Sequence, residues 1–597
     1  MNKHHTLCIA RLLAALALGL SPAMAAQKQQ EPAAAPLSEA GSKLETKYAA
    51  MLDALQKDIA QALPKIDEPQ RTAFLQAYQA EAAAQVPAKA VLNLLEGFLT
   101  SDKLDAQLVK SAVLAQATPH GLAGFAQQGK EQEALVEKLL ADDGLMKQMV
   151  VAAGAAGGRY GQAMKIYTDI QQASPQAKEG ILQRLALGTS LEHAVPVGQS
   201  NPQDQPNAPT IVDPVQRYLH FEKAYLAGEL DPGFKDLSVW DYRFVGNGNE
   251  TDEILAWGRE MLRNYNPDHI RNPDYRWRYV ESVKTDVKYG SQDQKNDLPS
   301  LHGYQNMINT GGVCGRRAFF GRFILRCFGI PTLARPQPGH ATLVHWTPAG
   351  WVICLGATWG NGKVDGKADT EFLTMTQARS VGDAYLQVLR AQWAGAALGE
   401  TAAAATGFWN GVASYRQREM IEKAKAVTLA AVGTDIGEAN ESKEKEIIKA
   451  AAVTEADKKI VAGPDGVITI PAVACSNPTN STPKIRFMKS YLGGMQLHYS
   501  RLGNAEPFEY TFDAPAAGKY ALSARVVTVS PGQHLLVAAN DAKEPVDIAA
   551  PYTIGKWDKT PPVEILLVKG TNVLHLSRGG ENIKGLTIKD FTLTPVK

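Results

Sequence analysis

The stretch that decides the fold of the central region is residues 311–331, which read GGVCGRRAFFGRFILRCFGIP. After Cys314 the apolar residues recur at helical spacing, which predicts a buried helix over 314–328. These residues are Phe319, Phe320, Phe323, Ile324, Cys327 and Phe328. Gly329, followed by Ile-Pro, is a typical helix stop. We therefore expect Cys314 at the N-terminus of a buried helix, where the helix dipole favours a thiolate and the preceding glycines allow close approach to the sulfur.

The residues that follow predict a β-hairpin. Residues 339–356 read GHATLVHWTPAGWVICLG, an alternating stretch, a Thr-Pro-Ala-Gly turn and a second alternating stretch. His340 and His345 are an odd number of residues apart, so they point to opposite faces of their strand. At most one of them can readily meet the Cys314 thiol. His340, beside the flexible Gly339, is the one that we predict.

Together, these features resemble the transglutaminase-like superfamily: a Cys behind glycines at a helix start, a helix ending Phe-Gly-Ile-Pro, a strand opening Gly-His-Ala and a hairpin to Gly-Trp-Val. The resemblance covers residues 311–362. It implies an α+β, papain-like core in which Cys314 is the nucleophile and His340 its general base. The implied reaction passes through a thioester whose acyl group is handed to water or to an amine. The backbone N–H of Cys314 is the expected oxyanion donor, with Gln305 or Tyr304 as a second donor.

One position departs from the pattern of that family. The family places an Asp behind the His on the returning strand, and here Gly356 stands at the corresponding position. Thr358, Asn361 and Asp365 are the nearby polar residues, and we take Asn361 as the third member because Asn can orient a His. The other readings are a Cys–His dyad, or a domain that has kept the fold and binds without turnover.

The C-terminal part, residues 464–597, consists of short alternating segments, which predict an all-β jelly-roll sandwich. Its run at 510–520, YTFDAPAAGKY, resembles galactose-binding-like sandwiches, a group that includes many carbohydrate-binding modules. The resemblance implies a sugar ring stacked on an exposed aromatic side chain, and the candidates are Trp557, Tyr552 and Tyr499. A sandwich without a ligand is the other reading. Some relatives carry a structural calcium ion.

The rest of the chain divides by composition. Residues 1–25 have a basic start, a short apolar run and small residues at the expected cleavage site, which predicts a signal peptide. Residues 26–198 are rich in helix-forming residues and predict an α-helical domain. Residues 199–211 are polar and proline-rich, which predicts a linker before a transglutaminase-like domain at 212–430. The charged, helix-forming residues 431–463 predict a connecting helix.

Composition excludes several classes of protein. The chain has 597 residues, more than one hydrophobic core usually serves, and its 62 Lys and Arg balance 61 Asp and Glu, so we expect no nucleic-acid partner. No stretch after the leader approaches about twenty uninterrupted apolar residues, so no membrane span is expected there. The few cysteines are not a disulfide framework, although they leave room for one bridge, and they lack the paired spacing of a zinc site. Apart from the calcium ion of the sandwich, we expect no cofactor.

These observations predict a secreted, periplasmic or cell-surface enzyme that acts on amide bonds, as a peptidase, amidase or transamidase, through a Cys–His thioester mechanism. The expected substrate is a protein, a glycoprotein or a peptidoglycan-type cell-wall peptide. The alternative is a catalytically inactive transglutaminase-like surface protein that binds glycan or protein. The sequence does not separate hydrolysis from acyl transfer, because the outcome depends on whether water or an amine reaches the thioester.

Overall fold

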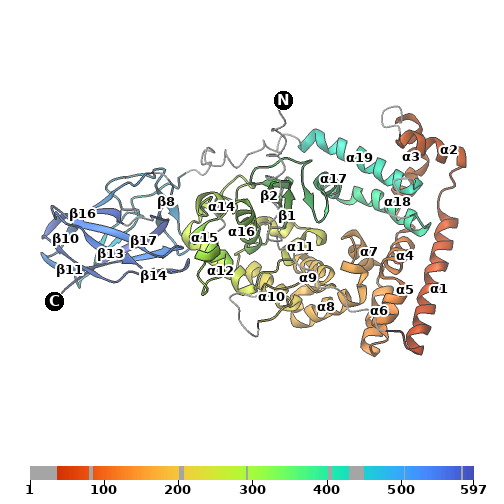
Figure 1. Ribbon diagram of the computed structural model, residues 1–597, viewed down its shortest axis with the longest axis horizontal. Coiled ribbons are helices and arrows are strands. Elements are labelled where there is room, and N and C mark those ends of the chain that lie inside the picture. Colours follow the sequence, from red (N-terminus) through yellow and green to blue (C-terminus); the bar gives the residue numbers. More distant parts are fainter. Residues whose placement is uncertain are drawn as a thin grey trace, which may run out of the picture.

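The structure is a computed structural model of the 597-residue chain. It describes residues 36–79, 85–200, 208–290, 294–400, 407–428, 450–502, 504–579 and 583–596. The predicted signal peptide and most of the predicted connecting helix, 431–463, lie outside these residues. The described part of that segment, residues 450–463, is not a helix: it forms coil and a turn and ends in the short strand β6 (Val461–Ala462). The molecule is elongated, with helices at one end, a mixed region in the middle and a β-sandwich at the other end (Figure 1). Within the described residues, no helix is both long enough and apolar enough to cross a membrane.

The N-terminal part consists of helices that bury apolar residues in a common core, as predicted. Their bounds are α1 (Glu39–Ala62), α2 (Glu68–Gln79), α3 (Gln85–Leu99), α4 (Asp105–Ala117), α5 (Pro119–Ala126), α6 (Lys130–Ala141), α7 (Asp143–Val151), α8 (Tyr160–Ala173) and α9 (Gly180–Glu192). Polar side chains cap several of these starts, since Ser38 accepts the N–H of Gly41 at α1 and Asp142 accepts the N–H of Leu145 at α7.

The central region begins with further helices and ends with helices that return to the N-terminal part. Their bounds are α10 (Pro214–Leu226), α11 (Val239–Gly246), α12 (Asp252–Tyr265), α13 (Asp268–Arg271), α14 (Glu281–Thr285), α15 (Gly303–Thr310), α16 (Cys314–Cys327), α17 (Asp369–Arg379), α18 (Leu386–Ala397) and α19 (Phe408–Thr428). Arg390 of α18 pairs with the buried Asp105 of α4, at 2.7 and 2.9 Å. Trp409 of α19 packs edge-on against Phe98 of α3. One hydrophobic core therefore extends across both sides of the predicted linker.

The predicted helix and hairpin are confirmed around Cys314 and His340. Helix α16 begins at Cys314 and is followed by an antiparallel sheet of order β1-β2-β3. The strands are β1 (Thr332–Gln337), β2 (His340–Thr347) and β3 (Gly350–Cys354), and β4 (Lys363–Val364) pairs with β5 (Lys367–Ala368) in a separate hairpin. A Cβ added at Gly321 would lie 2.6 Å from the side chain of Leu343, so this glycine lets α16 pack closely on β2.

The C-terminal part is an all-β sandwich, as predicted. Its strands are β6 (Val461–Ala462), β7 (Ile468–Pro471), β8 (Ile485–Lys489), β9 (Met495–Tyr499), β10 (Phe508–Ala514), β11 (Gly518–Thr528), β12 (Gln533–Ala539), β13 (Val546–Ala550), β14 (Asp558–Lys559), β15 (Val563–Leu567), β16 (Gly570–Gly579) and β17 (Leu586–Pro595). One sheet has the order β10-β16-β12-β13, and the other is built around β11 and β17. In β10, Phe508, Tyr510 and Phe512 are buried while Thr511 and Asp513 are exposed. The inward residues of both sheets form a second core.

Polar contacts join the sandwich to the end of α12. The side-chain amide of Asn264 donates to the carbonyl of Gly555 at 3.1 Å, and Gln496 donates to the carbonyl of Asn264 at 2.8 Å. The hydroxyl of Thr587 donates to the carbonyl of Tyr265 at 2.6 Å. Buried polar groups are costly when they lose their partners, so these bonds fix how the sandwich sits on the central region.

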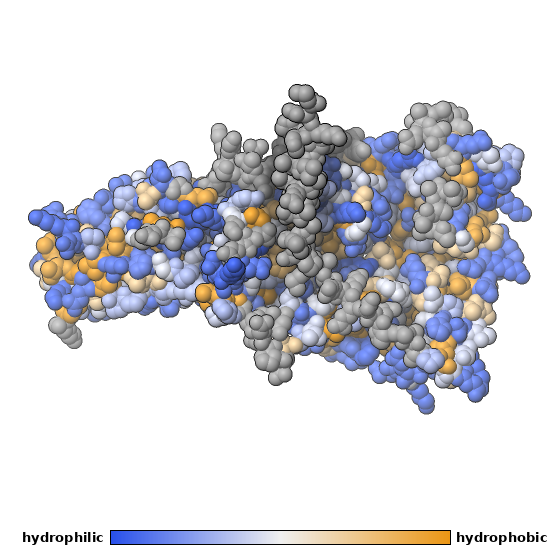
Figure 2. Space-filling model, in the orientation of Figure 1, coloured by the Kyte–Doolittle hydropathy of each residue, from blue (hydrophilic) through white to orange (hydrophobic). Residues whose placement is uncertain are grey.

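The surface is largely hydrophilic, and the face in Figure 2 gathers apolar residues at the free end of the sandwich. The exposed apolar side chains of this part include Leu566 and Val568, on and just after β15, and Val546 at the start of β13. Scattered exposed apolar side chains are usual on soluble proteins, and these lie on or beside strands at the sheet margins.

Candidate functional site

Cys314 is the first residue of α16 and the one partly exposed cysteine of the described residues. Cys327, Cys354 and Cys475 are buried. Burial raises the pKa of Cys475 to about 12 and that of Cys327 well above its ordinary value. Because the thiolate is the reactive form of cysteine, Cys314 is the cysteine that is placed to react.

The chain enters α16 through a glycine pair that lies against another segment. Gly311 has a φ of +82°, and a Cβ there would lie 2.3 Å from the carbonyl oxygen of Lys288. Gly312 donates its N–H to that same oxygen at 3.1 Å. Val313, the residue just before α16, has an apolar side chain that cannot accept the free N–H groups at the start of the helix. The positive end of the helix dipole is therefore directed at the Cys314 position without a side-chain cap.

Cys314 and His340 lie at the same end of the layer formed by α16 and its sheet. Strand β1 runs back along α16 and β2 returns, so α16 and β2 run in the same direction. At the far end, Arg326 of α16 approaches the carbonyl of Thr332 at 3.5 Å, and Thr332 is paired with His345. Cys314 precedes Arg326 by about 18 Å of helix, and His340 precedes His345 by about 17 Å of strand. The two residues therefore reach the same level of the layer.

The ring of His340 is held by a backbone carbonyl. Its Nε2 lies 2.8 Å from the carbonyl oxygen of Leu355. Because a carbonyl only accepts, Nε2 carries the proton, and the lone pair of the neutral ring is on Nδ1. Leu355 is buried and has a φ of +63°, rare for a residue with a side chain, and Gly356 follows with a φ of +79°. This turn at the end of β3 directs the carbonyl to His340, so the backbone fixes the tautomer of the ring.

A buried ion pair anchors the loop after β3. Arg335 donates to Asp369 from Nε at 2.9 Å and from Nη2 at 2.6 Å, and the two side chains are 0% and 1% exposed. Asp369 also accepts the N–H groups of Gly360 and Gly362, at 2.9 and 3.0 Å. Asn361, the predicted third member of the triad, lies between these glycines with an exposed side chain. The carboxylate of Asp369, at the start of α17, thus holds this loop, whereas the imidazole of His340 is bound by the carbonyl of Leu355 at the end of β3.

The other two polar residues considered for that role also lie outside the strands. Thr358 contributes its carbonyl oxygen to Arg335 at 2.5 Å. Asp365 is exposed in the turn between β4 and β5, with a φ of +50°.

The two side chains predicted as oxyanion donors belong to α15. Tyr304 is buried, stacks on phenylalanine rings of α16 and donates to Glu250 at 3.2 Å. Gln305 accepts the N–H of His302 through its side-chain oxygen at 2.9 Å, and both residues line a pocket described below. The backbone N–H of Cys314 lies at the start of α16, at the positive end of the helix dipole.

A Cys–His contact that involves neither Cys314 nor His340 lies in the core. The Sγ of Cys354 is 3.4 Å from Nε2 of His345 and donates to the carbonyl of Arg276 at 2.7 Å. The two residues are 3% and 1% exposed, and burial lowers the pKa of His345. The register of β2 is unbroken, which places His340 and His345 on opposite faces, as predicted. This pair has no access to a substrate.

The three aromatic residues predicted to stack on a sugar are engaged within the molecule. Tyr499 is fully buried in the sandwich, so its ring has no free face. Trp557 donates to the side-chain oxygen of Asn264 at 3.0 Å. Tyr552 accepts from the side-chain amide of Asn309 at 2.9 Å. Trp557 and Tyr552 are therefore tied to the central region rather than presented at the free end of the sandwich.

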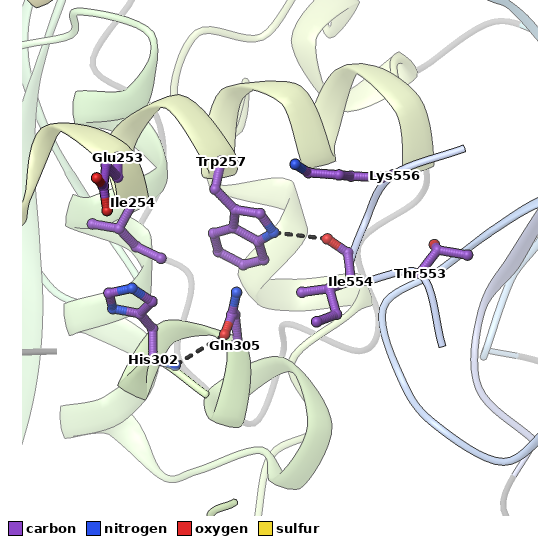
Figure 3. Close-up of a pocket in the computed structure, with 8 residues that line it drawn as sticks. All are labelled: Glu253, Ile254, Trp257, His302, Gln305, Thr553, Ile554 and Lys556. Carbon is purple, nitrogen blue, oxygen red and sulfur yellow. Dashed lines mark hydrogen bonds between the residues drawn. The ribbon is translucent and has the colours of Figure 1, made fainter. Parts of the chain in front are cut away.

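A pocket of about 400 Å³ lies at the junction of the two parts (Figure 3). Its lining residues are Glu253, Ile254 and Trp257 of α12, His302 and Gln305 at the start of α15, and Thr553, Ile554 and Lys556 before β14. Sequence reasoning missed this pocket, because it is assembled from segments that are far apart in the chain. Among the residues that the structure describes, no group of three or more His, Cys, Asp or Glu side chains is placed to hold a metal ion.

No protein-family model matches the chain, and no curated protein matches it. Among solved structures, the C-terminal sandwich resembles carbohydrate-binding modules. One is the C-terminal CBM6 of LamC, a marine laminarinase of Zobellia galactanivorans, with 17% identity over 21% of this chain and 98% of that chain and a TM-score of 0.18. Another is a family 35 module of Clostridium thermocellum, with 15% identity, 22% and 98% coverage and a TM-score of 0.18. The module CBM6cm-2 of Cellvibrio mixtus lichenase 5A, solved with cellotriose, shares 18% identity, 22% and 97% coverage and a TM-score of 0.18. The similarities give no support to the transglutaminase-like resemblance of the central region.

Proposed function

We propose that the chain is an exported thiol-dependent enzyme that acts on amide bonds, with Cys314 as nucleophile and His340 as general base. The observation that carries the proposal is the arrangement at one end of the α16 layer. A partly exposed cysteine begins a buried 14-residue helix, and a histidine at the same level has its Nε2–H bound by a carbonyl. The burial of the other three described cysteines supports the same choice of nucleophile.

In the proposed reaction, the Sγ of Cys314 attacks the amide carbon and the thiol proton passes to Nδ1 of His340. The oxyanion that forms faces the N–H of Cys314 and the positive end of α16. As the C–N bond breaks, the imidazolium returns the proton to the leaving amine, and a thioester to Cys314 is left. Water or a second amine then attacks the thioester with His340 as base. This step gives an acid or a new amide and restores the thiol.

The carbonyl of Leu355, which binds His340, determines the rate of turnover that we expect. A carboxylate would stabilise the imidazolium by its charge, whereas a carbonyl fixes the tautomer and adds only a dipole. In a Ser–His–Asp protease, replacing the acid by its amide lowers kcat about 10⁴-fold. We therefore expect slow turnover.

Because His340 is held by an uncharged carbonyl and not by a carboxylate, the alternative function is also favoured: a surface protein that binds glycan or protein without turnover. In that case the Cys314 and His340 arrangement is retained by the fold but forms no acyl-enzyme.

The test is whether an acyl-enzyme forms on Cys314. The full chain is incubated separately with casein and monodansylcadaverine, and with a peptidoglycan stem peptide, and the protein and products are read by mass spectrometry. We expect amide cleavage or amine incorporation that Cys314→Ala abolishes and that the buried control variant Cys475→Ala retains. Activity that survives Cys314→Ala would contradict the proposed nucleophile, and the absence of any acyl product would favour the binding alternative.

A further inference from the structure

We propose that the pocket at the junction of the central region and the sandwich binds a sugar ring, with Trp257 as its aromatic wall. This binding site is separate from the Cys314 chemistry and does not depend on it. It also differs from the aromatic residues that the sequence suggested, because its wall belongs to the central region and the sandwich supplies the opposite side.

The indole of Trp257 is held rigidly at the pocket. Its Nε1 donates to the carbonyl of Ile554 at 2.7 Å, and one face of the ring stacks on Phe323, with centroids 6.0 Å apart and planes 15° apart. The ring lies along the pocket in Figure 3, between Ile254 on one side and Ile554 on the other. A preorganised aromatic surface loses little entropy on binding and suits the apolar face of a pyranose.

The polar groups around this ring match hydroxyl groups, which both donate and accept. The side-chain oxygen of Gln305 accepts the N–H of His302, so the amide nitrogen is the end directed toward Trp257 in Figure 3. Burial lowers the pKa of His302, so this imidazole is neutral at pH 7. Its side chain accepts the backbone N–H of Gln305 in the capping box of α15, which leaves the other ring nitrogen, as N–H, to donate to a hydroxyl. Glu253 supplies carboxylate acceptors, and Lys556, whose Nζ also lies 3.9 Å from the carboxylate of Glu260, supplies an ammonium donor from the sandwich.

The charge and size of the pocket argue for a sugar over other small ligands. One acidic and one basic side chain line it, a balance that gives no net attraction for a phosphorylated or strongly anionic ligand. Its polar groups disfavour a purely apolar ligand, because they would lose their hydrogen bonds to water without replacement. The volume of about 400 Å³ falls in the range of small-molecule sites.

The pocket also lies on the path to Cys314. Gln305 and Asn309 share one face of α15, and Asn309 binds Tyr552, the neighbour of the pocket residue Thr553. The chain between Gln305 and Cys314 is half helical, which limits their separation to about 21 Å. If the proposed function holds, a substrate that carries both a glycan and an amide bond can engage both sites.

Isothermal titration calorimetry of the full chain with chitotriose, with cellotriose and with the dipeptide Ala-Gln tests the proposal. We expect one of the saccharides to bind with a Kd below about 1 mM, since protein sites of this size reach such affinities. Gln305→Ala should weaken this binding about 5- to 10-fold, the effect of one lost hydrogen bond. Lys559→Ala, an exposed change on nearby β14, is the matched control and should bind as the unmodified chain does.

Two further variants separate the possible failures. Trp257→Phe keeps an aromatic wall and should retain part of the binding, whereas Trp257→Ala should lose it. Cys314→Ala should bind the saccharide normally, so a failure of the thiol chemistry does not count against the pocket. No saccharide binding at 10 mM, unchanged binding in Gln305→Ala, or binding of Ala-Gln alone would each overturn the assignment to a sugar.

Discussion

Replacing Asp369 by Asn tests the buried ion pair that anchors the loop behind the hairpin. Asp369 accepts two bonds from the Arg335 guanidinium and two from backbone N–H groups, and its side chain is 1% exposed. The amide cannot satisfy this set, because its NH₂ end would face a donor, and the Arg335 charge would be left buried without its partner. Breaking one side of such a pair costs about 3–5 kcal/mol. At about 2 °C per kcal/mol for a unit of this size, Tm should fall by about 6–10 °C.

Thermal unfolding followed by differential scanning calorimetry measures this change. The matched control is Asp365→Asn, an exposed position in the nearby turn where Asn tolerates the positive φ, and it should shift the unfolding free energy by less than about 0.5 kcal/mol. The double variant Arg335→Met/Asp369→Leu should recover much of the loss, since no buried charge is left unpaired. A Tm change below about 2 °C in Asp369→Asn would refute the reasoning.

Three further predictions concern other parts of the molecule. Burial holds the pKa of His498 and that of His193 at about 4, below the ordinary 6.5, so only the unfolded state takes up these protons as the pH falls. The free energy of unfolding that these histidines contribute is therefore complete above pH 6.5 and falls toward pH 4, and at pH 5 the loss is about 2 kcal/mol per histidine. His498→Asn should flatten the dependence of Tm on pH. Asp105→Asn leaves Arg390 buried without its partner and should loosen α18 from α4, which faster hydrogen exchange of the α18 amides would reveal. Asn264→Ala removes bonds to both Gly555 and Trp557 and should weaken the junction by about 1–3 kcal/mol, seen as faster proteolytic release of the sandwich.

Local patterns were sufficient to predict the helix and hairpin that carry Cys314 and His340. The apolar stripe of the helix, its Gly-Ile-Pro stop and the Thr-Pro-Ala-Gly turn each act within a few residues. The acceptor that holds His340 was not predictable in this way. Sequence reasoning looked for a polar side chain near Gly356, whereas the acceptor is the carbonyl of Leu355, placed by a positive φ that its residue type disfavours.

Long-range packing accounts for the other differences. Alternating residues, as in β10, reveal the strands of the sandwich. They cannot show that Tyr552 contacts α15 or that Trp557 contacts α12, because each of these contacts joins residues more than two hundred positions apart. The same holds for Arg390 and Asp105, which bring α18 back to the N-terminal helices. The junction pocket follows from these contacts and has no local signal.

The central claim is that Cys314 and His340 act together, and site-resolved alkylation of the folded chain by iodoacetamide at pH 7 tests it most directly. We predict that Cys314 labels readily, that the buried Cys327, Cys354 and Cys475 stay unlabelled, and that His340→Ala slows the labelling of Cys314 about tenfold or more. His302→Ala is the control and should leave the rate unchanged. An inert Cys314, or the same rate in His340→Ala as in the unmodified chain, would contradict the claim.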